Sequence, residues 1–247
     1  MKIDILVGHG KSNGILNRYD SGAVSGGFEE FQVAKEIAKY AHDYLFSNFV
    51  VDSSLINFDG TLSLNERISR YKKRSCADCI LEIHLNSFHT KSPSGTEVWH
   101  YPGDCVGEGL AAKISSDLSL LFSIPNRGAK ATNKQKFGII DSTAPTALLV
   151  ETCFISNPTD VAHVASADGQ KNAGECIAKS IASFFTLEKR KTTTKPSNTY
   201  TVLPGDSFWK IARDRLGSGK RYNELARFNG MLATDTIFAG QILNLPD

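Results

Sequence analysis

Three ionisable side chains each lie at or just after the end of an apolar run in the sequence. They are His9, which stands between two glycines, His84 and Glu151. Two more carboxylates, Glu29 and Glu30, open a segment whose apolar residues have helical spacing. Neutral imidazoles with a carboxylate, and with one coordination position left open, form the ligand set of a catalytic zinc ion. A single histidine of this kind usually serves local structure only, but three ionisable groups at one sheet edge favour a reactive site.

The elements that must position these side chains alternate between strand and helix. Strands are predicted at residues 2–7, 78–85, 96–101 and 146–152, and helices at 30–45, after the capping box of Ser63 and Glu66, at 110–121 and at 173–184. Such alternation is typical of an α/β fold, with a mostly parallel or mixed sheet that helices cover on both faces. Ligands of such sheets bind beyond the carboxyl ends of the strands, which is where the three side chains are predicted to lie.

Length, composition and charge exclude several classes of protein. The chain has 247 residues, 41% of them hydrophobic, and a net charge of +2. It therefore has enough apolar residues for a sizeable core and lacks the basic character of a nucleic-acid-binding domain. Because no apolar run reaches the roughly 18 residues of a membrane-spanning helix, we expect no membrane insertion. The chain start lacks the pattern of a secretory signal, so we expect the protein to be cytoplasmic on synthesis.

The five cysteines are odd in number and irregularly spaced, which argues against a disulfide framework. Cys76 and Cys79 have the C-x-x-C spacing, but no second pair completes a zinc knuckle. We interpret the cysteines as reduced thiols, and the sequence leaves the role of this pair open.

A segment without apolar residues, 188–198, divides the chain. It is charged, then rich in threonine, and ends in Pro-Ser-Asn, a composition that indicates an extended linker. The sequence thus predicts a larger domain at 1–187 and a smaller one at 199–247.

Seven segments stand in order in the larger domain, over about residues 2–185: ILVGHG, FEEFQVAKEIA, LSLNERI, LEIHLNS, GTEVWHY, NRGAK and LLVETCFISNPTD. In their order and approximate spacing they resemble the zinc-dependent N-acetylmuramoyl-L-alanine amidases of the Amidase_3 group. The resemblance implies that Zn²⁺ is bound by His9, Glu30 and His84. It also implies that Glu151 is the catalytic acid and base.

Spacing within the resemblance separates the two neighbouring glutamates. The family glutamate precedes an Ile-Ala pair at a fixed distance, and Glu30 has this distance to Ile37 and Ala38, whereas Glu29 does not. Glu29 is interpreted as a solvated acid in the first turn of the helix. The glycines beside His9 would let the backbone pass close to the metal.

The resemblance also implies the reaction. Zinc would turn water into a nucleophile at neutral pH and polarise the amide carbonyl between the lactyl group of muramic acid and L-alanine. Glu151 would take the proton of the water and pass it to the leaving amine. Asn86, Asn126 and Arg127 are candidate substrate-binding residues, although hydrogen bonding within turns and loops is an equally good interpretation. Arg67 is expected to be structural.

Two positions depart from the family pattern. Val7 replaces a proline, which affects loop stiffness, and Glu82 replaces a residue that is small in many members. By strand alternation Glu82 shares a face with His84. It is either a partner of the metal site or a separately paired core carboxylate, and the sequence does not separate these interpretations.

The smaller domain resembles a LysM module over residues 199–246. Strand patterns at 200–203 and 242–245 flank two short helical patterns, a βααβ arrangement. LysM modules bind glycans that contain N-acetylglucosamine, and the resemblance implies a groove formed by Gly205, Asp206, Ser207, Asn229, Gly230 and Ile237. Trp209 lies within a helical pattern, and we predict that it belongs to the core and does not form a platform for sugar.

The sequence therefore predicts a peptidoglycan hydrolase: a zinc amidase that a LysM module targets to the cell wall. Its expected partners are the muramyl peptide and the N-acetylglucosamine-containing glycan of bacterial peptidoglycan. The absence of a signal pattern favours a phage or prophage endolysin released through a holin, or an autolysin that acts at cell lysis. Two alternatives remain open, a zinc endopeptidase that cuts the stem peptide and a non-catalytic wall-binding protein.

Overall fold

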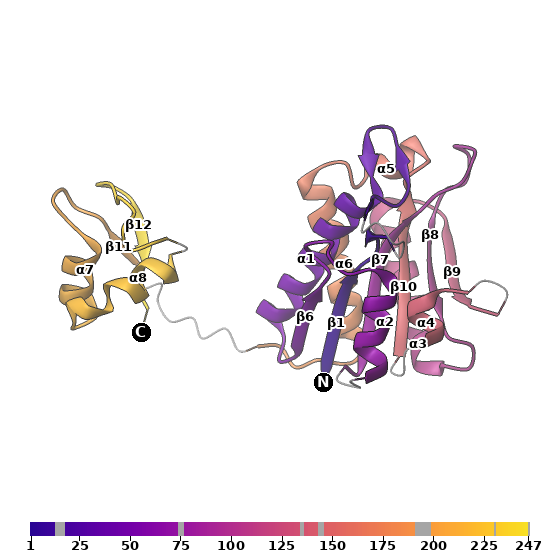
Figure 1. The fold of residues 1–247 in the computed structure, drawn as a ribbon, viewed down its shortest axis with the longest axis horizontal. Helices are drawn as coiled ribbons and strands as arrows, with labels where there is room; N and C mark the ends of the chain where they lie inside the picture. Colours follow the sequence, from indigo (N-terminus) through magenta and orange to yellow (C-terminus); the bar gives the residue numbers. More distant parts are fainter. Residues whose placement is uncertain are drawn as a thin grey trace. The chain divides into compact units, whose positions relative to one another are not determined.

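The computed structural model describes residues 1–12, 18–73, 77–133, 136–142, 146–190, 199–229 and 231–246. The chain forms two compact units, Met1–Arg190 and Lys191–Asp247 (Figure 1). Cys76 and most of the predicted linker fall outside the described residues.

A twisted sheet forms the centre of the first unit. Among the described residues its strand order is β6 (Asp52–Ile56), β1 (Lys2–Val7), β7 (Cys79–Asn86), β10 (Thr146–Phe154), β8 (Thr96–His100) and β9 (Asn126–Ala131). All neighbouring pairs are parallel except β8 and β10, which are antiparallel. The prediction of a mostly parallel, mixed α/β sheet is confirmed.

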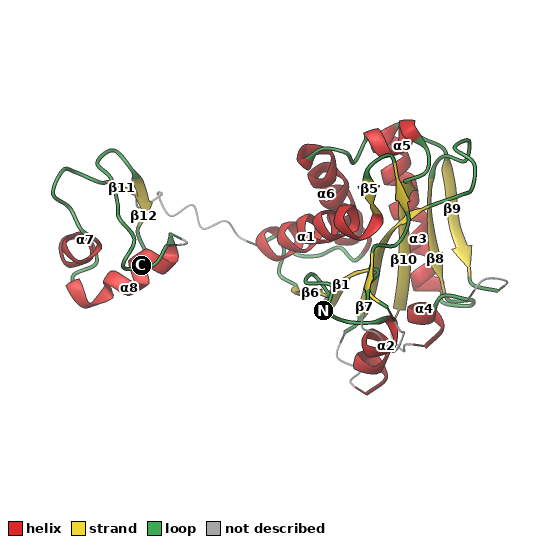
Figure 2. Ribbon diagram, turned by 45° about the horizontal axis from the view of Figure 1, so that its top comes forward, coloured by secondary structure: helices red, strands yellow, loops and turns green. Residues whose placement is uncertain are grey.

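Helices cover both faces of this sheet (Figure 2). One face packs against α1 (Glu30–Asn48), α3 (Cys105–Phe122) and α6 (Ala167–Phe184), which form the larger apolar core with it. The other face packs against α2 (Leu64–Lys73) and α4 (Gly138–Ser142) around a smaller core. A short helix, α5 (Pro158–Ala162), follows β10.

Side chains along β7 point alternately to the two faces of the sheet. Cys79, Leu81 and Ile83 join the larger core, whereas Ile80 joins the smaller core under α2 and α4. By the same period of two, Glu82 and His84 lie on the α2 and α4 face. This face therefore carries ionisable groups where the strand approaches its carboxyl end.

Two short hairpins fill the connection between β1 and α1. The first pairs β2 (Gly10–Lys11) with β3 (Tyr19–Asp20), and the second pairs β4 (Val24–Ser25) with β5 (Phe28–Glu29). The second hairpin leads directly into α1, whose first residue is Glu30. The first hairpin returns the chain to His9, because Gly10 and Asp20 are register partners.

Sequence patterns located most of these elements but missed some of them. The capping box is present, since Glu66 Oε2 accepts hydrogen bonds from Ser63 N (2.8 Å) and Ser63 Oγ (2.7 Å) at the start of α2. The edge strands β6 and β9 and the short helices α4 and α5 were not predicted. The last strand continues past Glu151 to Phe154, with an irregularity in its register between these residues.

The predicted linker begins too early. Backbone hydrogen bonds join Val50 N to Glu188 O (2.8 Å) and Arg190 N to Asn48 O (2.7 Å). Backbone groups pair without any apolar side chain, so a charged segment can still be part of the folded unit.

The second unit is a small α and β domain. An antiparallel pair of strands, β11 (Thr199–Thr201) and β12 (Ile242–Asn244), accompanies α7 (Phe208–Arg215), a 3₁₀ helix η1 (Gly219–Arg221) and α8 (Tyr222–Phe228). Its core consists of Val202, Phe208, Ile211, Ala212, Leu225, Ala226, Leu243 and Leu245. This arrangement matches the predicted βααβ order.

The prediction that Trp209 belongs to the core is wrong, because its residue surface is 50% exposed. Phe208, Ile211 and Ala212 occupy the inward positions of α7, spaced three and four residues apart. Trp209 is one position off this stripe and lies against Gly219, where an added Cβ would be 2.4 Å from the indole.

No helix in the described parts of the chain has both the length and the apolar character needed to cross a membrane.

Candidate metal centre and active site

His9, Glu30 and His84 converge at the carboxyl ends of the central strands. Glu30 lies between the histidines: its Oε1 is 2.9 Å from His84 Nδ1, and its Oε2 is 3.2 Å from His9 Nε2. Each of the three residues offers one ligand atom, and these atoms lie within 4.8 Å of one another. Two imidazole nitrogens and one carboxylate at such separations fit a zinc ion, whose bonds to these ligands are about 2.0–2.2 Å long.

A strained turn after β1 presents His9 to this centre. The residue has φ of 59°, in the left-handed region, and its carbonyl accepts a hydrogen bond of 2.9 Å from Asn57 Nδ2. The same amide group donates to Val7 O, also at 2.9 Å, so one side chain holds both ends of the turn. Gly8 is required here, because a Cβ at this position would lie 2.2 Å from the ring of His84.

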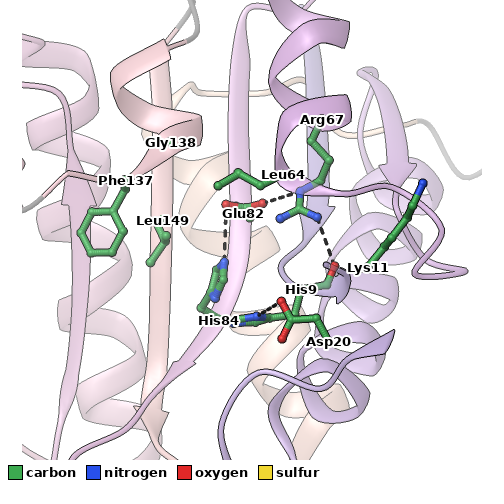
Figure 3. Close-up of a pocket in the computed structure, with 10 residues that line it drawn as sticks. All are labelled: His9, Lys11, Asp20, Leu64, Arg67, Glu82, His84, Phe137, Gly138 and Leu149. Atoms are coloured by element: carbon green, nitrogen blue, oxygen red, sulfur yellow. Dashed lines mark hydrogen bonds and ion pairs between the residues drawn. The ribbon is translucent and has the colours of Figure 1, made fainter. Parts of the chain in front are cut away.

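The second nitrogen of each histidine faces another carboxylate. Asp20 Oδ2 is 3.1 Å from His9 Nδ1, and Glu82 Oε2 is 3.4 Å from His84 Nε2 (Figure 3). Metal-ligating histidines commonly donate their remaining N–H to a carboxylate, which fixes the tautomer and the ring orientation. The nitrogens that face Glu30 are therefore the ones placed to bind a metal.

The cluster favours an ionised Glu30. Burial raises the pKa of its carboxyl, but hydrogen bonds from His84 and His9 outweigh this effect and hold the pKa well below its usual range. Burial lowers the pKa of both histidines, yet the neighbouring carboxylates leave each pKa raised. Because imidazole binds metals in its neutral form, metal binding here would release protons.

Glu151 lies beside His84, its register partner on the neighbouring strand β7. Its Oε2 is buried and has no hydrogen-bond partner among the described residues. Burial is the main cause that raises its pKa to about 8, the charges of Glu30 and Glu97 add to this effect, and His84 opposes it. A carboxyl group with this pKa can both hold and release a proton near neutral pH.

Glu97 lies next to Glu151 on the side away from His84. The sequence patterns did not identify it as a candidate site residue. It is the register partner of Glu151 on the antiparallel strand β8, and it is 4% exposed. Four side chains donate hydrogen bonds to its carboxylate: Asn86, Trp99, Arg127 and Lys130. The cations of Arg127 and Lys130 keep the pKa of Glu97 below its usual range despite burial.

The candidate substrate-binding residues separate into two groups. Asn86 and Arg127 both lie within this Glu97 cluster beside the metal centre. The side chain of Asn126 is exposed and accepts a local hydrogen bond of 2.9 Å from Gly128 N.

A cavity of about 190 Å³ opens beside the metal centre on the α2 and α4 face. Figure 3 shows the residues that line it: His9, Lys11, Asp20, Leu64, Arg67, Glu82, His84, Phe137, Gly138 and Leu149. Both histidines and Glu82 are among the residues that line this cavity. Arg67, predicted to be structural, is buried and binds Glu82 through its Nε at 2.9 Å.

In the second unit, the polar side chains among the predicted glycan-binding residues form hydrogen bonds within the domain itself. Asp206 accepts hydrogen bonds from Tyr200 Oη (2.6 Å) and Leu203 N (2.9 Å), and Ser207 caps α7. Asn229 connects α8 to β12 through bonds to Leu225 O, Asn244 O and Asn244 N. Gly205 has φ of 82° in its turn, Ile237 is partly buried against the core, and Gly230 falls outside the described residues.

Comparisons with known proteins place both units of the chain in known families. The Amidase_3 family, described as N-acetylmuramoyl-L-alanine amidase, matches residues 3–183, and the LysM domain family matches residues 200–246. An uncharacterised protein of Bacillus subtilis, YqiI, is 30% identical over 169 residues, 67% of this chain and 79% of YqiI.

Proteins named as N-acetylmuramoyl-L-alanine amidases are similar as well. The N-acetylmuramoyl-L-alanine amidase LytC of Bacillus subtilis is 28% identical over 67% of this chain, and the aligned region spans 33% of LytC. The solved structure of the amidase AmiC2 of Nostoc punctiforme is 25% identical, with a TM-score of 0.64 over 75% of this chain and 97% of that chain. The chain therefore belongs to the N-acetylmuramoyl-L-alanine amidase family and carries a LysM domain at residues 200–246.

Proposed function

We propose that this amidase is zinc-dependent and hydrolyses the amide bond between N-acetylmuramic acid and the L-alanine of the stem peptide. One observation carries the proposal: the His9, Glu30 and His84 cluster lies beside a buried carboxylate oxygen of Glu151 that no described residue binds. A ligand set and an adjacent proton acceptor are the two parts that metal-assisted amide hydrolysis requires.

His9, Glu30 and His84 would hold the zinc ion. When bound, zinc supplies Lewis-acid chemistry, making a water molecule acidic enough to attack near neutral pH and polarising the carbonyl that it attacks. Glu151 accepts the proton of that water at its Oε2 and delivers it to the leaving amine of L-alanine. Glu151 accepts the proton as a carboxylate and holds it as a carboxylic acid until the amine leaves.

The Glu97 cluster would bind the peptide side of the substrate. Asn86 and Arg127 lie there next to Glu151, and the side chain of Arg127 is 37% exposed. A partly exposed guanidinium can bind a carboxylate of the stem peptide while keeping its bond to Glu97. The side-chain oxygen of Asn126 accepts a hydrogen bond from Gly128 N, so this residue would help to bind substrate by shaping the start of β9.

Digestion of purified peptidoglycan followed by mass spectrometry tests the reaction. The amidase should release intact stem peptides that begin with free L-alanine. New termini within the stem peptide or the cross-bridge would support the endopeptidase alternative. Absence of products from zinc-loaded protein would support the non-catalytic wall-binding alternative.

The LysM domain would direct the enzyme to glycan that contains N-acetylglucosamine. Residues 191–247 should sediment with purified cell walls, and residues 1–190 should cleave soluble wall fragments near normally but lyse intact cells poorly. Equal lysis of cells by residues 1–190 and by the full chain would contradict the targeting role.

The biological setting of the proposal is an endolysin or an autolysin of cell lysis. Coexpression with a holin tests it: lysis should follow holin expression in cells that contain this chain and fail with the Glu151→Gln variant. Lysis without the holin would contradict release by that route.

A further inference from the structure

A buried ion pair, Arg67 with Glu82, lies beside the ring of His84, next to its Nε2. We infer that Glu82 is a positioning residue for zinc: it accepts the Nε2–H of His84 and so directs Nδ1 toward the metal. This inference rests on the proposed zinc dependence, and it assigns the residue whose two interpretations the sequence left open.

The two oxygens of Glu82 have different partners. Oε1 accepts a hydrogen bond of 2.9 Å from Arg67 Nε, whereas Oε2 lies 3.4 Å from His84 Nε2. A carboxylate paired only with a guanidinium commonly uses both oxygens in a two-bond fork. Here the second oxygen is directed at the ring of a metal-ligating histidine (Figure 3).

The ring nitrogen has no better acceptor. A separation of 3.4 Å exceeds a good N–H···O bond, but His84 Nε2 is buried and has no hydrogen-bond partner elsewhere among the described residues. An unsatisfied buried N–H costs about 1–3 kcal/mol, so a small movement of the ring toward Glu82 is favoured. With the proton on Nε2, the lone pair of Nδ1 is free to bind a metal. Nδ1 lies on the Glu30 side of the ring, 2.9 Å from Glu30 Oε1.

Arg67 fixes the position of Glu82 and also reaches the other histidine ligand. Its Nη1 donates to the carbonyl oxygens of Leu62 (2.8 Å) and His9 (3.1 Å). The side chains of Arg67 and Glu82 are 4% and 3% exposed. The Arg67 guanidinium therefore bonds both to the backbone of His9 and to Glu82, the carboxylate that faces the ring of His84.

Asp20 provides an internal comparison. It lies 3.1 Å from His9 Nδ1, in the same relation to its histidine as Glu82 to His84, but its side chain is 42% exposed. Water can replace an exposed acceptor, whereas it replaces a buried one less readily. We therefore expect the larger effect on zinc affinity at Glu82.

The test measures zinc affinity of the full-length chain by competition with a chromophoric chelator at fixed pH. Glu82→Gln and Glu82→Ser should each weaken zinc binding about 10–100-fold, the usual effect of losing such a partner. The control is Asp160→Asn, which alters another buried carboxylate with bonds to Ser94 Oγ, Gly95 N and Phe154 N. It should lower the melting temperature and leave zinc affinity of the folded protein unchanged.

A second measurement does not depend on any variant. Ring ¹⁵N NMR of the zinc-loaded wild type should show His84 protonated at Nε2 and metal-bound at Nδ1. The opposite tautomer, or unchanged zinc affinity in both Glu82 variants, would overturn the inference while leaving zinc dependence intact. Failure of the wild type to bind zinc would overturn the proposed function as well.

Discussion

The two units of the chain use their polar side chains in opposite ways. In the amidase unit, Glu151 Oε2 is buried without a partner among the described residues, and Glu30 joins two histidines whose outer nitrogens face further carboxylates. In the LysM unit, the polar side chains in the candidate groove, those of Asp206 and Asn229 among them, bond to their own domain.

This difference predicts what a mutation should change. A buried polar group without a partner is costly to stability, and one that adjoins a candidate metal centre is a candidate for chemistry. Substitutions at such a group should alter chemistry more than stability. Substitutions at a group that is fully bonded within its domain should alter stability first.

The metal ligands give the largest expected effect. His9→Ala, Glu30→Ala and His84→Ala should each abolish zinc binding and hydrolysis, because three protein ligands are the minimum of a catalytic zinc site. Metal analysis and wall digestion measure the two effects. The matched control is Glu29→Ala, since Glu29 bonds Tyr19 Oη at 2.6 Å and lies outside the cluster. One zinc per chain in Glu30→Ala and none in Glu29→Ala would reverse this assignment.

Replacement of the unpartnered carboxylate is the next test. Glu151→Gln keeps the shape of the side chain and removes its proton-accepting oxygen, so turnover should fall by about 10²–10⁴-fold. Zinc content and wall binding by the LysM unit should stay at wild-type values, because no ligand has been removed. A variant that retains more than about a tenth of wild-type turnover would show that another group carries the acid and base role.

The raised pKa of Glu151 predicts a pH-dependent stability of chelator-treated protein. The folded chain keeps this proton up to about pH 8, whereas the unfolded chain loses it near 4.5. Stability from this group is therefore complete below pH 4.5 and is lost as the pH rises toward 8, by at most about 1.4 kcal/mol per pH unit. Between pH 4 and pH 9 the melting temperature of Glu151→Gln should fall less steeply with rising pH than that of the wild type. An equal fall in both proteins would contradict the prediction.

The smallest effects are expected in the LysM unit. Ser207→Ala removes the N-cap of α7, in which Ser207 Oγ accepts from Lys210 N at 3.2 Å, and should cost about 1 kcal/mol of unfolding free energy. Thermal melts and wall binding of residues 191–247 measure this effect, and Ser207→Thr, which keeps the hydroxyl, is the control. Weaker wall binding at unchanged stability would break the comparison between the units.

Local sequence patterns were sufficient for several parts of the fold. The capping box of Ser63 and Glu66 lies within four residues, and its hydrogen bonds form as expected. The alternation along β7 correctly placed Glu82 on the same face as His84, because a strand assigns faces by a period of two. The helical stripe failed at Trp209, where a shift of one position exchanged core for surface.

What the sequence by itself determined is the α/β class, the LysM-like order of elements and the types of residue near the ends of the strands. Tertiary structure decided which of these residues meet, because the order and register of strands depend on contacts distant in sequence. The antiparallel pairing of β8 with β10 places Glu97 beside Glu151, and the packing of α2 on the sheet places Arg67 against Glu82. Neither pairing has a local signal, since each is fixed by burial of the apolar faces that surround it.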